Sequence, residues 1–177
     1  MAIQIGAKPD SGFDDPLGML KDCHRRIEQF LHILATVAAR AGEGELSGEE
    51  KNAVEASLRY FRTGGQRHNQ DEEESLFPRL RAENTAGQMD ELDRLESDHH
   101  RASELHETVD RLYSAWITAD RLSSEDQARL LAATREMERL YAEHIQVEER
   151  IVFPHAAQVL NSHTLAAIGA EFSARRK

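Results

Sequence analysis

The sequence predicts an all-α fold, an antiparallel up-down-up-down four-helix bundle followed by a short C-terminal helix. Three observations support this prediction. Strand signals are weak, because aromatic residues make up only 6% of the chain and the β-branched residues do not alternate over a run. Apolar residues instead recur at spacings of three and four, the period of a helix with one buried face. The segments with this period are joined by short stretches, which favour antiparallel neighbours.

The first helix is expected over residues 16–41. Asp15 followed by Pro16 is typical of an N-cap with proline at the first helical position. Gly42 then stands where a helix often ends on a glycine. The caps and the apolar period therefore define the same segment.

The second helix is expected to start after Ser47. Ser47 and Glu50 have the spacing of a capping box, in which each residue satisfies a backbone N–H of the other. The apolar period that follows extends the helix to Arg81. Gly64 and Gly65 lie inside it, and they predict a bend or an interruption there.

The second half of the chain repeats this arrangement. A third helix is expected from Gln88 to Thr118, and the segment 124–127 is expected to cap a fourth helix that continues to Leu160. The predicted organisation is an N-terminal extension over 1–13, the bundle over 14–160, and a terminal helix and tail over 161–177.

Composition excludes several classes of function. The formal net charge is -10, with 32 acidic against 22 basic residues, so neither nucleic acid nor an anionic membrane is an expected partner. The basic tail from Arg175 to Lys177 is interpreted as a solvated end. No apolar stretch approaches the ~18 residues that a membrane span needs. Cys23 is the single cysteine and no signal peptide is recognisable, so a reducing, cytoplasmic location is expected.

One pattern occurs twice in the chain. The stretch HNQDEEESLFP at 68–78 corresponds to HIQVEERIVFP at 144–154, with histidine, glutamate and Phe-Pro at the same positions. His68 and His144 are 76 residues apart, and His24 and His99 are 75 apart. One helical hairpin is therefore used twice.

His24 lies in the apolar seam of the first helix, in series with Leu17, Leu20 and Ile27. A single histidine in such a seam is most often a hydrogen-bonded core residue. The other three predicted helices also have a histidine at the corresponding position. The interpretation as a core residue therefore has to account for four histidines.

In the third helix the helical period separates two adjacent histidines. His99 stands in the same relation to Leu92 and Leu95 as His24 does to its own apolar neighbours, whereas His100 shares its face with polar residues such as Ser103. We therefore expect His99 to point into the bundle and His100 to face solvent.

The second and fourth helices each add one histidine and one glutamate to the bundle axis. His68 and His144 lie on apolar faces, and Glu72 and Glu148 follow them by four residues, which is one helical turn. Two buried glutamates without a counter-ion would cost several kcal/mol each or take up protons. A pair of metal ions removes this difficulty. Imidazole and carboxylate ligands without thiolates suit iron, manganese or zinc, and bundle cores of this kind commonly hold two metal ions.

These motifs resemble the hemerythrin-like, or HHE, cation-binding family. L-x-x-x-H occurs at 20–24 and 95–99, and H-x-x-x-E-E occurs at 68–73 and 144–149, each time followed by Phe-Pro. The resemblance covers residues 14–160. It implies a four-helix bundle holding two iron ions with an oxo or hydroxo bridge, with manganese or zinc less favoured. By this resemblance the terminal ligands would be histidines and the bridging ligands glutamates: His24, His68, His99, His144, Glu72 and Glu148.

The chain departs from the oxygen-carrying members of that family. Those proteins have a fifth histidine in the third helix, where this chain has Leu95 and Ser103. Glu149 stands where they have an aspartate, so either Glu148 or Glu149 could be the bridge, and the match to the first half favours Glu148. His106 is a candidate fifth nitrogen, but about 10 Å of helix rise separates it from the ligand position, so a supporting hydrogen bond is favoured.

Two functions share this predicted ligand set. The first is a non-haem di-iron protein that binds or senses dioxygen or nitric oxide. The alternative is a di-iron enzyme that acts on nitric oxide or peroxide, or that takes part in iron-sulfur cluster repair or iron homeostasis. A bundle with incidental metal or none is a third interpretation. The residues do not separate the first two functions, and they do not identify a protein partner.

Overall fold

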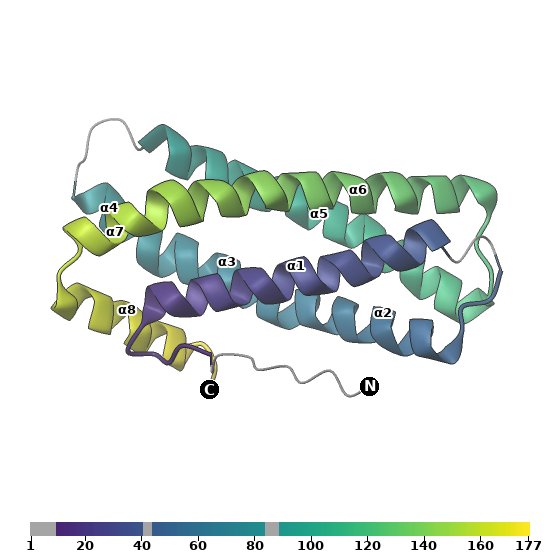
Figure 1. Cartoon of the computed structure of the whole chain (residues 1–177), viewed down its shortest axis with the longest axis horizontal. Coiled ribbons are helices and arrows are strands. Elements are labelled where there is room, and N and C mark those ends of the chain that lie inside the picture. The colour runs from purple at the N-terminus through teal and green to yellow at the C-terminus, as the bar shows by residue number, and fades with distance from the viewer. Residues whose placement is uncertain (1–9, 41–43, 84–88) are drawn as a thin grey trace, which may run out of the picture.

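The protein is a bundle of long antiparallel helices (Figure 1). The computed structural model describes residues 10–40, 44–83 and 89–177. These residues form helices, turns and connecting segments, with no strand among them. The predicted all-α helical bundle is confirmed. Within the described part of the chain, no helix is long and apolar enough to cross a membrane.

Two of the four rods are single helices and two are interrupted. The first and third rods are α1 (Pro16–Arg40) and α5 (Met89–Ala119). The second rod alternates α-helix with π-helical turns, in the order α2 (Gly48–Tyr60), η1 (Phe61–Gly65), α3 (Gln66–Asp71), η2 (Glu72–Leu76) and α4 (Phe77–Ala82). The fourth rod consists of α6 (Ser124–Val147), η3 (Glu148–Val152) and α7 (Phe153–Val159), and α8 (Ser162–Ala174) follows it.

The predicted caps agree with the structure, with one correction. Asp15 accepts a hydrogen bond from the backbone N–H of Gly18, and Ser47 and Glu50 form the complete capping box. The fourth rod is capped by Ser123 rather than Ser124, because Ser123 has the extended backbone that lets its hydroxyl accept from the N–H of Asp126. Gly42, which was expected to end the first helix, lies outside the described residues.

The predicted interruption at Gly64 and Gly65 is a π-helical turn, so the rod is widened there but continues. Two more such turns begin at Glu72 and Glu148 and end immediately before Phe-Pro. Proline has no N–H for an intrahelical hydrogen bond, and a π-helical turn accommodates the altered ladder. The repeated Phe-Pro therefore marks the end of each turn that carries a glutamate.

Polar residues separate two apolar clusters along the bundle. α1 packs against α2 and α6, and α5 packs against α6. The larger cluster fills the end near the α1–α2 and α5–α6 connections, and it includes Leu34, Val54, Val109, Trp116 and Met137. The second cluster fills the opposite end and includes Leu20, Leu76, Phe77, Phe153 and Phe172. In every rod the histidine of the predicted site lies between residues of the two clusters, so hydrocarbon seals the site at both ends.

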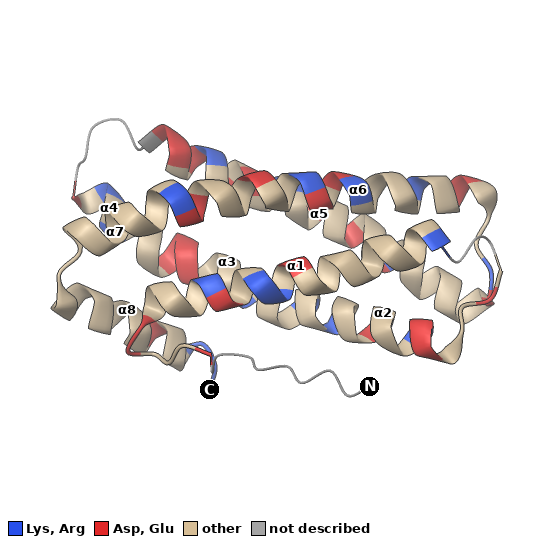
Figure 2. Cartoon of the chain, in the orientation of Figure 1, with Lys and Arg blue, Asp and Glu red and all other residues tan. Residues whose placement is uncertain are grey.

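Charged residues lie mostly on the outer faces of the rods. Acidic and basic residues alternate along α1 and α6 in Figure 2 rather than gathering by sign. Asp71 is different, because its side chain is completely buried. Arg175 and Arg176, just after α8, reach this carboxylate at 2.9 and 2.5 Å. The tail interpreted from sequence as a solvated end therefore neutralises a buried acid beside Glu72.

The ion pairs of Arg175 and Arg176 with Asp71, called the tail clamp below, can be tested by their contribution to the stability of the protein. Removing both guanidinium groups with Arg175→Ala and Arg176→Ala leaves Asp71 buried without a counter-charge, so we expect a loss of about 3 kcal/mol in the free energy of unfolding. Adding Asp71→Asn to that variant should recover most of the loss, because the side chain at position 71 then carries no charge. Denaturant unfolding measures both changes.

The matched control is Arg25→Ala. Its partner is Asp22, and the Arg25 side chain is 60% exposed. Such a surface pair contributes under about 1 kcal/mol. If Arg25→Ala and the double tail variant lost equal free energy of unfolding, the stabilising role of the tail clamp would be contradicted.

Candidate metal centre

The six residues of the predicted site meet in the middle of the bundle. α1 supplies His24, α5 supplies His99, and the two interrupted rods each supply one histidine and one glutamate. All six side chains are buried, with exposed fractions between 0 and 4%: His24, His68, His99, His144, Glu72 and Glu148. The apolar clusters on both sides keep this polar layer dry.

The six residues form two overlapping groups of four. His24 and His68 belong to one group, His99 and His144 belong to the other, and both groups contain Glu72 and Glu148. Within each group the candidate ligand atoms all lie within 4.8 Å of one another. Two neighbouring metal ions that share two side chains would suit this arrangement.

Glu72 offers one carboxylate oxygen to each group. Its Oε1 lies 3.4 Å from Nε2 of His68, and its Oε2 lies 3.3 Å from Nε2 of His99. A carboxylate whose two oxygens face different imidazoles has the orientation of a bridging ligand.

Glu148 repeats this orientation from the opposite rod. Its Oε2 lies 3.0 Å from Nε2 of His24, and its Oε1 lies 3.2 Å from Nε2 of His144. The choice of Glu148 over Glu149 as the inward-facing acid therefore agrees with the geometry, although metal ligation itself stays a prediction.

The inner atoms of this site lack hydrogen bonds. All four carboxylate oxygens of Glu72 and Glu148, and Nε2 of His24, are buried without a hydrogen-bond partner among the described residues. Leaving a buried carboxylate unsatisfied costs several kcal/mol. Nε2 of His99 and Nε2 of His144 lie only 3.2 Å apart, as two ligands of one ion do. Two cations fit these nitrogen and oxygen donors.

Acids outside the site orient the imidazole rings. Nδ1 of His24 lies 2.9 Å from Oε1 of Glu149, and Nδ1 of His99 lies 2.6 Å from Oε1 of Glu73. An ionised carboxylate only accepts, so each Nδ1 carries the proton and each Nε2 keeps its lone pair for a metal. The hydrogen bond from His99 lowers the pKa of Glu73, which keeps it ionised. Sequence reasoning missed Glu73, although the repeated Glu-Glu pair was its signal.

The remaining two histidines are supported differently. Nδ1 of His144 lies 3.5 Å from Oδ2 of Asp98, whereas Nδ1 of His68 is buried without a hydrogen-bond partner among the described residues. Asp98 directly precedes His99, and the corresponding residue before His24 is Cys23. A buried thiol replaces the carboxylate, so the two groups of four have unequal surroundings.

Burial and charge set the protonation of the site. Burial lowers the pKa of His68 well below its usual value, and the neighbouring His24 adds to this. Although burial opposes it, the Glu148 carboxylate raises the pKa of His144 to about 9. Burial and the adjacent Glu148 also raise the pKa of Glu72 well above its usual value. Without metal, His144 therefore holds a proton at neutral pH, and Glu72 holds its proton more tightly than an exposed glutamate does.

Two other histidines lie outside the centre. His106 belongs to neither group of four, and its Nε2 lies 2.9 Å from the hydroxyl of Tyr141. The ring of Tyr141 lies edge-on to that of His144, with centroids 6.4 Å apart. His106 is thus connected to the site through a tyrosine, in keeping with the supporting role favoured from sequence. His100 is exposed, as the helical period predicted.

The fold and site together define a class: four-helix proteins whose core presents histidine and glutamate to metal ions. The model of the hemerythrin HHE cation binding domain matches residues 15–156. The chain belongs to this family. Among curated proteins, no relative matches the chain.

Replacing the two adjacent histidines of α5 tests the assignment of the buried ligand. His99→Ala should remove most of one metal ion per chain, because it deletes an inward-facing nitrogen. His100→Ala is the matched control and should keep the full metal content. Elemental analysis of the purified variants measures this, and the opposite pattern would contradict the inward position of His99.

Metal binding should release protons. At pH 7 we expect at least one proton per chain to leave when metal binds, the one on His144, because ligands must be deprotonated. The pKa values of His144 and Glu72 are both raised, so apparent metal affinity should rise as the pH increases toward 9. Calorimetry in buffers of different ionisation enthalpy measures the release, and a pH-independent affinity between 6 and about 9 would refute this protonation scheme.

Proposed function

We propose that this protein is a non-haem di-iron protein that binds or senses a small diatomic molecule, dioxygen or nitric oxide. The observation that carries this proposal is the pair of buried carboxylates, Glu72 and Glu148, each with one oxygen toward each group of histidines. Ligand arrangements of this kind in bundle cores commonly hold two iron or manganese ions.

The donor set favours iron over other metals. It contains nitrogen and oxygen and no thiolate, which suits iron, with manganese or zinc less favoured. Each group offers four side chains, fewer than the number of ligands iron usually takes. Iron, when bound, would supply redox activity and open coordination positions for a small molecule.

Two phenylalanines protect the site. Phe153 stacks on His24 with ring centroids 5.5 Å apart, and Phe77 stacks on His99 at 6.3 Å. Both phenylalanine side chains are almost fully buried. The two phenylalanine rings fix the orientation of the imidazole rings and exclude water from this end of the site. This favours the binding of a small ligand over a reaction with water.

The second candidate is a di-iron enzyme that acts on nitric oxide or peroxide, or that takes part in iron-sulfur cluster repair or iron homeostasis. The observation that favours it is the number of imidazoles. His106 is bonded to Tyr141, so each group has two histidines and both metal positions keep room for a reacting molecule. The single cysteine supports a cytoplasmic location for either function.

Reconstitution with ferrous iron under anaerobic conditions tests the proposal. We expect about two irons per chain, with a Mössbauer spectrum that shows two unequal sites because Asp98 supports only one of them. Less than one iron per chain would reject the di-iron centre.

The reduced protein would then be mixed with dioxygen, nitric oxide or hydrogen peroxide while its absorbance is followed. A stable adduct with dioxygen or nitric oxide supports the binding protein, and sustained consumption of nitric oxide or peroxide supports the enzyme. As the control, Glu148→Gln keeps the shape of the side chain but removes its charge, and it should lose iron together with either response.

A further inference from the structure

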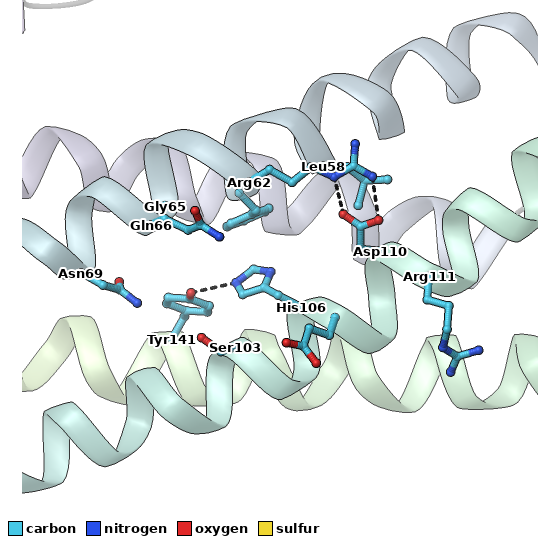
Figure 3. A pocket seen from close by; sticks show the side chains of 12 residues that line it. Leu58, Arg62, Gly65, Gln66, Asn69, Ser103, His106, Asp110, Arg111 and Tyr141 are labelled. Carbon is cyan, nitrogen blue, oxygen red and sulfur yellow. Dashed lines mark hydrogen bonds and ion pairs between the residues drawn. The ribbon is translucent and has the colours of Figure 1, made fainter. Parts of the chain in front are cut away.

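A pocket of about 380 Å³ opens between the second rod and α5 (Figure 3), and neither of the two stacked phenylalanines lines it. Gly65, Gln66 and Asn69 line it from the second rod, and Ser103 and His106 line it from α5. Tyr141 of α6 lies deeper, toward the bundle core. None of these residues belongs to either metal-binding group.

The floor of this pocket touches the metal site. The hydroxyl of Tyr141 is hydrogen-bonded to His106, and the two rings meet edge to face. The Tyr141 ring also lies edge-on to His144, one of the inward-facing histidines, with ring centroids 6.4 Å apart. The His106–Tyr141 pair is therefore the layer between the pocket and the centre.

The π-helical turn η1 shapes one wall of the pocket. His106 packs against Phe61, the first residue of this turn, with ring centroids 4.4 Å apart. Gly65, its last residue, adds no side chain, and a Cβ there would lie 3.3 Å from Cδ1 of Phe61. π-helical turns are frequent at functional sites, and here the turn keeps the wall open.

The lining mixes apolar side chains, such as Leu58, with polar and charged ones. At the mouth, Arg62 forms two hydrogen bonds with Asp110, so these charges neutralise each other. Burial lowers the pKa of His106 to about 4, and the imidazole is neutral at physiological pH. Gln66, Asn69 and Ser103 form no side-chain hydrogen bond within the described part of the chain. The pocket thus offers free amide and hydroxyl groups to a neutral molecule.

We propose that this pocket binds a small, uncharged, hydrogen-bonding molecule of the size and chemistry of hydrogen peroxide, and that the His106–Tyr141 pair passes it to the metal centre. The inference rests on the second candidate of the proposed function, a di-iron enzyme that acts on peroxide, because it supplies the approach to the same site. A neutral peroxide gains hydrogen bonds to the amides and hydroxyl without the desolvation cost of an ion. Arg62 is paired with Asp110, and Glu107 and Arg111 add one charge of each sign, so the lining carries no net charge to steer anions or cations.

Blocking the pocket in the iron-loaded protein is the first test. Ser103→Trp places a large side chain over the pocket from an exposed position, so folding should be preserved. The second-order rate constant for reaction with hydrogen peroxide, followed by stopped-flow absorbance, should fall about tenfold at unchanged iron content. Gln66→Trp, from the opposite wall and also exposed, should have the same effect.

Two controls separate this route from others. Ser97→Trp makes the same change on an exposed face of α5 outside the pocket and should leave the rate unchanged. Ala157→Trp covers a second surface pocket, which reaches Phe153 and Pro154 instead. A wild-type rate in Ser103→Trp and Gln66→Trp, or a fall in Ala157→Trp alone, would overturn the proposal.

A second measurement does not depend on reactivity. In the zinc-loaded, diamagnetic protein, titration with methanol, a non-oxidising molecule of similar size, should shift the NMR signals of the His106 ring. If the iron protein reacts but these signals do not move, the pocket inference fails and the proposed function stands. If the signals shift but the iron protein responds to neither dioxygen, nitric oxide nor peroxide, the proposed function fails and the binding pocket remains.

Discussion

The burial of two carboxylates in a dry layer is the constraint on which the rest of this structure depends. Glu72 and Glu148 are completely buried, and none of their oxygens has a hydrogen bond within the described residues. Hydrocarbon clusters lie on both sides of this layer, so water cannot relieve the charge. Four imidazole rings direct their Nε2 atoms toward these two acids. The carboxylates of Glu149, Glu73 and Asp98 lie beside the Nδ1 atoms of three of the rings. The site is organised to receive positive charge at its centre.

The duplicated hairpin explains the symmetry of the site, and its exceptions are informative. Glu73 and Glu149 hold corresponding histidines, and Phe77 and Phe153 stack on corresponding rings. Elsewhere the halves differ, because Asp98 in one half corresponds to Cys23 in the other. Two metal ions in this site would share their bridging ligands but not their outer hydrogen bonds, so their electronic properties would differ.

A second asymmetry involves the end of the chain. Asp71 precedes Glu72 in the first half, whereas Val147 precedes Glu148 in the second. The acid is neutralised by Arg175 and Arg176, which lie beyond the residues 15–156 that the family model matches. α8 also places Ile168 and Phe172 in the apolar cluster beneath the site. The C-terminal helix therefore stabilises the turn that carries Glu72, one of the two buried acids of the site, and the pocket lies against the opposite face of the same rod.

Much of the fold and of the inner site could be predicted from the sequence, because the information is local. Caps and apolar period define the rods, and a rotation of about 100° per residue is enough to separate His99 from His100. The repeated motif indicated which glutamates face inward. Only the tertiary structure decided the partners that come from different rods: Glu149 with His24, His106 with Tyr141, and the tail arginines with Asp71. The helical period sets the direction of a side chain on its own rod, but a contact between rods depends on their spacing and relative height, which packing of the whole bundle determines.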